Sequence, residues 1–178
     1  IELLLSHPVK RSKISKALFA GLSLSMVMAY WIGVGIPLLV FADWNVAVMM
    51  IAAGSLVSVI FVAVAFLSSI ITRDKARGIR ASIILWLYFA ILFDALVLFL
   101  FFQFADYPIE KAVVVLSAFS PIDLFRILVL LKLDVSAMLG YTGAIFKYFF
   151  GHAGGLVLSF ALLLLWIVIP FYWSQKKF

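Results

Sequence analysis

Cysteine is absent from the 178 residues, and histidine, proline and charged residues are scarce. The lack of cysteine excludes disulfides, thiolate metal sites and thiol catalysis within this chain. Only 12% of the residues are charged, against about a quarter in an average soluble domain. Because 67% of the residues are hydrophobic, the net charge of +6 does not form a basic face on a soluble fold. The composition therefore excludes a nucleic-acid-binding domain and favours a membrane protein.

Several catalytic motifs are missing as well. The chain has no G-x-x-x-x-G-K-[ST] phosphate loop, so any use of ATP must come from another chain. It has no H-E-x-x-H or G-x-S-x-G motif, and its two histidines lie on opposite sides of the expected membrane. Met26 with Met28, and Met49 with Met50, could bind Cu(I), but methionine is also ordinary filler in apolar packing. We expect no enzymatic activity, no metal site and no cofactor.

Four long apolar runs are the main feature that the sequence does contain. They cover residues 17–42, 46–72, 81–104 and 153–173. Each is long enough to cross the hydrocarbon core of a lipid bilayer as a helix, which takes about 20 residues. The sequence therefore predicts an all-α polytopic membrane helix bundle with four spans in this chain.

Positive charge alternates between the segments that separate these runs. Basic residues gather before the first run, between the second and third, and after the fourth: Lys10, Arg11, Lys13, Lys16, Arg73, Lys75, Arg77, Arg80, Lys176 and Lys177. The segment after the first run holds only Asp43 as a charge, and the charges of residues 105–152 sum to zero. Because basic loops stay in the cytoplasm, we expect a multi-pass protein of the bacterial inner membrane with both ends cytoplasmic.

This topology divides the chain into four parts. Residues 1–16 form a cytoplasmic segment, 17–104 three spans, 105–152 an outer, periplasmic segment, and 153–178 the last span with its tail. The first segment is either a basic flank at the membrane surface or a docking helix for a cytoplasmic partner. The chain begins in the middle of an amphipathic stretch, so we expect it to be the C-terminal part of a longer protein with six spans.

The outer segment contains a clear signal for the start of a helix. Ser120 can cap the helix, Pro121 suits the first helical position, and Asp123 lies in the first turn, where a negative charge is favourable. Asp123 and Arg126 are three residues apart and can pair on one face. Residues 109–133 carry five charges, so we expect two short amphipathic helices on the outer membrane surface rather than a fifth span.

Asp94 is the ionisable residue placed deepest in an apolar run. A carboxylate inside a membrane is costly unless it is paired or faces water. It could couple transport to protons, contact cargo, lock two helices together, or serve packing as a neutral, hydrogen-bonded carboxyl. We expect no basic partner at the same depth. The hydrogen-bond partner of Asp94 should instead be Ser55, Ser58, water or a residue of further spans.

Pro37, near the outer end of the first run, should kink that helix, either as a hinge or as a tolerated proline.

Two stretches resemble a known transporter family. The opening ELLLSHPVKRSK resembles the cytoplasmic segment before the third span of ABC-2 type permeases, which typically reads E-L-L-L-[SA]-x-P-V-x-R. The matching residues are Glu2, Leu3, Leu4, Leu5, Ser6, Pro8, Val9 and Arg11. The stretch Ser120–Arg126 is similar to the N-P-x-D-x-[FY]-R motif of the permease of the nitrous-oxide reductase maturation system, with serine in place of asparagine. Asp94 resembles an acidic residue in the penultimate span of that group.

The resemblance implies function, partners and site residues. It implies a homodimeric permease with two cytoplasmic ABC ATPase subunits, coupled through Glu2, Leu4, Pro8 and Arg11. In the maturation system it also implies a periplasmic β-helical partner and a role in assembling the copper-sulfur centre of nitrous oxide reductase. Residues Pro121, Asp123, Phe125 and Arg126 would carry the outer-segment motif. The alternatives are an ABC-2 exporter of lipid, polysaccharide or drug-like cargo, and an ion-coupled carrier that works through Asp94.

Overall fold

The computed structural model describes residues 11–72, 74–103, 115–132 and 153–177, and every regular element in these ranges is helical. The elements are α2 (Arg11–Tyr30), η1 (Trp31–Gly35), α3 (Ile36–Phe41), α4 (Trp44–Thr72), α5 (Lys75–Leu87), η2 (Tyr88–Leu92), α6 (Phe93–Gln103), α8 (Pro121–Lys132) and α10 (Ala153–Lys177). Four stretches are long and apolar enough to cross a membrane: Ser12–Phe41, Trp44–Thr72, Ala76–Val97 and Gly154–Lys177. The prediction of an all-α polytopic bundle is confirmed.

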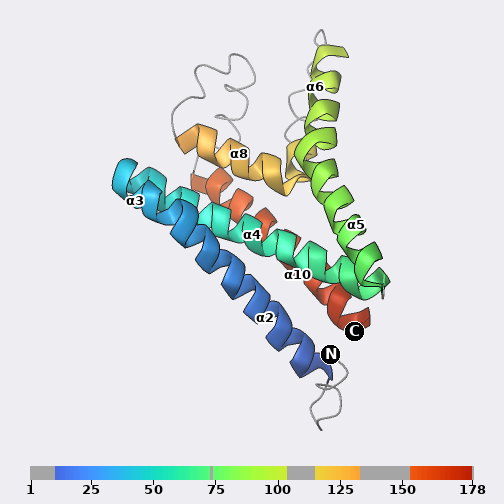
Figure 1. Cartoon of the computed structure of the whole chain (residues 1–178). Coiled ribbons are helices and arrows are strands. Elements are labelled where there is room, and N and C mark those ends of the chain that lie inside the picture. Colours follow the sequence, from blue (N-terminus) through green and yellow to red (C-terminus); the bar gives the residue numbers. More distant parts are fainter. Residues whose placement is uncertain (1–10, 73, 104–114, 133–152, 178) are drawn as a thin grey trace.

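The start of α2 and the end of α10 meet at one end of the bundle. Helices α2 and α4 form an antiparallel pair, and α10 packs along α4 (Figure 1). The ring of Phe19 in α2 contacts those of Phe66 in α4 and Phe171 in α10, with centroids 5.9 and 4.4 Å apart. The start of α2, the α4–α5 connection and the end of α10 therefore lie together. We call this the basic end, and the opposite end the distal end.

The α5–η2–α6 helix leaves the α4–α5 connection and diverges from the other long helices (Figure 1). Its contact with α4 is closest near the basic end, where Ser68 and Ser82 share a hydrogen bond of 2.8 Å. Gly78 lies there against Ser69, since a Cβ on Gly78 would come within 3.2 Å of the Ser69 Cα. Toward the distal end the two helices separate, and α8 packs between them.

Two helices widen into short π-helical segments. In η1 the amide of Ile36 donates to the carbonyl of Trp31, five residues earlier, and in η2 Phe93 donates to Tyr88 in the same way. Pro37 explains η1, because proline lacks an amide proton and its ring crowds the carbonyl four residues before it. A π-helical segment thus lies directly before the turn of Pro37, near the position where we expected a kink. No glycine or proline occurs in η2, which directly precedes α6.

The apolar core lies where α8 packs against α4 and α10. Leu124 and Leu128 of α8 are fully buried in one cluster with Ala53 and Ile60 of α4 and Leu163 of α10. Figure 1 shows α8 running alongside these helices, with its last residues toward the distal end. The expectation that this helix lies on the membrane surface is therefore wrong. Its two leucines are buried against the middle turns of spanning helices, which stabilises it more than an interface would.

Candidate functional site at the start of α8

The turn before α8 is built to end one helix and begin another inside the protein. Residues 115–118 are helical, and Ser117, Ser120 and Pro121 are buried. The Ser120 hydroxyl accepts a hydrogen bond of 3.2 Å from the Asp123 amide, which satisfies one free amide at the helix start. Pro121 has no amide proton that needs a partner. The predicted cap and helix start are confirmed.

This turn lies deep in the bundle. The indole nitrogen of Trp166 donates to the carbonyl of Ala118 at 3.3 Å. Trp166 is thirteen residues into α10, which is about 20 Å from the distal end at about 1.5 Å per residue. Its ring also meets Phe89 of η2 edge-on, with centroids 5.4 Å apart. Non-helical backbone at such depth needs protein partners, and Trp166 supplies one.

One turn into α8, Arg126 joins this helix to α6. Its Nη1 atom lies 2.6 Å from Oδ1 of Asp94, which is the second residue of α6. The expectation that Asp94 lacks a basic partner is therefore wrong, because α8 carries a guanidinium to its depth. Ser55 and Ser58, which we expected as partners, instead donate to carbonyls of their own helix. The side chains of Arg126 and Asp94 are 45% and 34% exposed.

Asp123 completes a cluster of one cation and two carboxylates. Its Oδ1 atom is 3.7 Å from Nη1 of Arg126, the three-residue pairing predicted from the sequence. Its side chain is only 9% exposed, and its Oδ2 atom has no hydrogen-bond partner among the described residues. Burial raises the pKa of Asp123 from its ordinary 3.8 to about 6, and the charge of Asp94 adds to the rise. The charge of Arg126 and the side chain of Ser120 both lower the pKa of Asp123, but they do not cancel the rise.

A second group of polar contacts joins α10 to α2 at the basic end. Gln175, near the end of α10, donates to the hydroxyl of Ser15 at 2.8 Å and accepts from Ser12 at 3.3 Å. Both serines lie in the first turns of α2. The last span is therefore tied to the helix that directly follows the first ten residues. Neither Gln175 nor Trp166 was a candidate on the sequence alone, because a single polar or aromatic residue in a helix has no recognisable motif.

The other residues predicted for the site lie outside this charged cluster. Pro121 is buried at the start of α8, and Phe125 packs against the apolar core from the same helix. Arg11 begins α2, while Glu2, Leu4 and Pro8 lie outside the described residues. The structure thus brings together Asp94, Asp123 and Arg126 of the predicted site.

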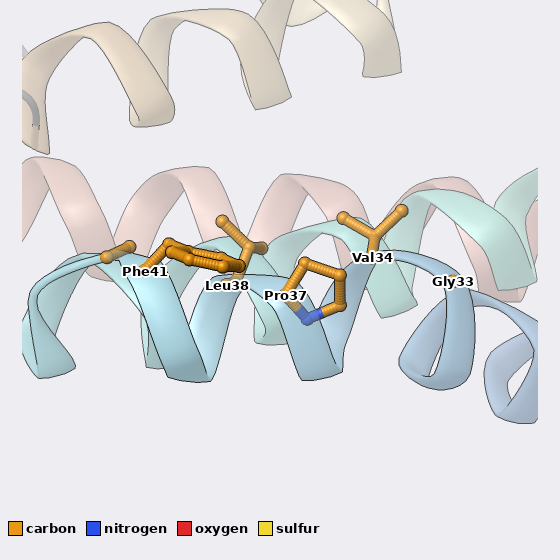
Figure 2. Close-up of a pocket in the computed structure, with 6 residues that line it drawn as sticks. Gly33, Val34, Pro37, Leu38 and Phe41 are labelled. Atoms are coloured by element: carbon orange, nitrogen blue, oxygen red, sulfur yellow. The ribbon is translucent and has the colours of Figure 1, made fainter.

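Two apolar grooves flank the η1–α3 segment at the distal end. One of about 330 Å³ follows Val34, Pro37 and Phe41, whose side chains line it in Figure 2. The other, of about 490 Å³, lies between this segment and α4 and includes Trp31 and Ile51. Both are lined by apolar side chains, so they provide no charged group for a polar ligand. The charged cluster of α8 is the stronger candidate site.

These features define a polytopic membrane protein in which a short helix is inserted between the spans and ion-paired to one of them. Residues 1–177 match the family described as ABC-2 family transporter protein, so the chain belongs to this family. It is a transmembrane permease subunit, and its family is not an enzyme family. A comparison with curated proteins found no match. The resemblance to ABC-2 permeases is thereby confirmed.

Proposed function

We propose that this permease transmits the motion of partner ATPase subunits from the basic end to the inserted helix α8. Family membership supports an ATPase partner, and the chain has no phosphate-binding loop of its own. In this proposal the basic end is cytoplasmic, and residues 1–16, with Glu2, Leu4, Pro8 and Arg11, dock onto the ATPase. A second copy of the permease completes the assembly.

The observation that carries this proposal is the pair of polar contacts made by α10. At the basic end, Gln175 binds Ser12 and Ser15, which lie in the last turns of the docking segment. At depth, Trp166 binds the carbonyl of Ala118 at the turn that starts α8. A helix is stiff along its axis, so displacement of the start of α2 is passed through α10 to this turn.

The finer proposal concerns what the motion accomplishes. The similarity of Ser120–Arg126 to the motif of the nitrous-oxide reductase maturation permease favours delivery of this motion to a periplasmic β-helical partner during copper-sulfur centre assembly. The cluster of Asp94, Asp123 and Arg126 holds the motif helix in place. An exporter of lipid, polysaccharide or drug-like cargo is the alternative that family membership equally supports.

The proposal is tested by measuring permease-dependent ATP hydrolysis in the complex of the full permease with its co-purified ATPase. Gln175→Ala removes both hydrogen bonds at the basic end, each worth about 1 kcal/mol. We expect the permease-dependent fraction of ATP hydrolysis to fall several-fold, while the complex still assembles. In a host that makes nitrous oxide reductase, the same change should lower the yield of its copper-sulfur centre.

Gln103→Ala is the matched control, because Gln103 is an exposed glutamine at the distal end of α6. The complex with Gln103→Ala should have the same permease-dependent ATP hydrolysis as the wild-type complex. Failure of the permease to co-purify with any ATPase would contradict the general proposal. A coupled complex with an unchanged copper-sulfur centre would contradict only the maturation role and favour the exporter.

A further inference from the structure

Asp123 carries a buried oxygen that the proposed transmission does not use. Its Oδ2 atom is enclosed and lacks a hydrogen-bond donor among the described residues, although the side chain lies in the first turn of α8. In the usual capping arrangement, an acid at this position accepts from the amide of the cap residue. Here the Ser120 amide donates to the Ser117 carbonyl at 3.3 Å instead, and the carboxylate of Asp123 is left without that donor.

The net charge of the cluster is the second observation that concerns the protonation of Asp123. Arg126 supplies one positive charge. It makes its short contact, 2.6 Å, with Asp94, and is 3.7 Å from the nearer oxygen of Asp123. With both carboxylates ionised the cluster has a net charge of −1, which is costly because the side chain of Asp123 is only 9% exposed. One proton makes the cluster neutral, and the carboxyl with the weaker contact to Arg126 is the one that holds it.

The helices that pack on α8 supply no further charge to Asp123. Residues 44–72, which form α4, contain no titratable side chain. In α10 the titratable residues are Tyr172, Lys176 and Lys177, which lie at the basic end. The η2–α6 segment contributes Asp94 and Tyr88. Within the described part of the chain, Asp94 and Arg126 are therefore the charges that act on Asp123.

We propose that Asp123 is a proton-binding site, and that its proton decides whether Arg126 pairs with Asp94 alone or is shared between two carboxylates. With the proton bound, α8 is ion-paired to α6 through Arg126 and Asp94. When the proton leaves, the new negative charge draws Arg126 toward its own helix and loosens the link between α8 and α6. This goes beyond the proposed transmission of motion, because it makes the link between the two helices dependent on pH.

The direction of the pH effect follows from the raised pKa of Asp123. A carboxyl whose pKa rises on folding is stabilising in its protonated form. That contribution is complete below the ordinary value of 3.8 and is lost as the pH rises through about 6. The link between α8 and α6 should accordingly be tight below this midpoint and loose above it.

The proton itself can be observed by infrared difference spectroscopy of the permease in liposomes. A protonated carboxylic acid has a carbonyl band that a carboxylate lacks, and this band should titrate with a midpoint near 6. Asp123→Asn should remove it, and Asp43→Asn, an exposed acid in the turn before α4, should leave it unchanged. Asp94→Asn should lower the midpoint, because the negative charge of Asp94 raises the pKa of Asp123.

The link between the helices can be followed by spin labels, because the chain has no native cysteine to interfere. Leu96→Cys on α6 and Val129→Cys on α8 place one label on each helix. The distance distribution should be narrow about one pH unit below the midpoint and broad about one unit above it. Asp123→Asn should keep it narrow at both values.

The proposal is overturned if no carboxylic acid band titrates in this range, or if Asp123→Asn retains the wild-type response to pH. Should Asp123→Asn fail to assemble, the wild-type band and its shift in Asp94→Asn still decide. An unmoved band in Asp94→Asn would place the proton on another residue. None of these measurements involves the ATPase, so their failure would leave the proposed transmission standing.

Discussion

Gly54 of α4 has no room for a larger side chain, because the phenol of Tyr30 lies against it. A Cβ at Gly54 would overlap both the ring and the hydroxyl of Tyr30. That hydroxyl donates to the Met50 carbonyl at 3.0 Å and so fixes α2 against α4. Small residues serve this purpose at membrane helix contacts, where backbones approach closely.

Gly54→Ala should therefore lower the midpoint of thermal unfolding in detergent. Overpacking of this kind costs about 1–3 kcal/mol, which outweighs the gain of about 1 kcal/mol in helix propensity. Gly21→Ala is the matched control, because a Cβ at Gly21 in α2 meets no atom within 4 Å and should leave the midpoint unchanged or raise it. Replacing Tyr30 by Leu should partly rescue Gly54→Ala. An equal effect of the two glycine substitutions would refute the close contact.

At the scale of elements, the position of α8 depends on an ion pair that joins two helices. Its apolar face alone would allow α8 to slide along α4, whereas the Arg126–Asp94 pair fixes its register against α6. Breaking one partner leaves the other charge at depth without compensation, which costs more than the pair contributes.

Exchanging the two charges of this pair tests whether Arg126 and Asp94 stabilise the protein through their interaction. Arg126→Asp alone gathers three acids, and Asp94→Arg alone places two guanidinium groups side by side, so each should lower thermal stability. The double variant Asp94→Arg with Arg126→Asp restores one cation between two acids and should recover most of the loss. We expect a coupling energy on the order of 1 kcal/mol, because both side chains are more than a third exposed. Additive losses would mean that the two residues do not interact.

The sequence predicted elements better than their contacts. The four spans follow from the lengths of the apolar runs, and α8 follows from Ser120 and Pro121 at its start. The ion pair could not be predicted, because Asp94 and Arg126 are 32 residues apart and meet only once α8 is inserted. The segment η2 gave no signal either, since YFAIL contains neither proline nor glycine. Within η2, Phe89 meets Trp166 of α10, a contact between residues far apart in the sequence.

At the scale of the whole molecule, the distribution of charge orients the protein. Lys13, Lys16, Arg77, Arg80 and Lys177 all lie in the helix turns at the basic end, while Arg126 is paired within the bundle. Over the full sequence, ten of the fourteen lysines and arginines belong to the segments at this end, against two of the eight acids. The insertion of α8 does not change this balance, because the helix starts deep in the bundle and returns toward the distal end.

The orientation predicts opposite signals from two reporter fusions. If α8 enters and leaves at the distal end, a reporter fused after residue 134 should be periplasmic and one fused after Phe178 cytoplasmic. A paired set of alkaline phosphatase and fluorescent protein fusions at each site gives the answer, and a fusion in the basic turn at Asp74 serves as a cytoplasmic control. A cytoplasmic signal after residue 134 would mean that residues 109–133 cross the membrane. It would also place Asp123 within a fifth span.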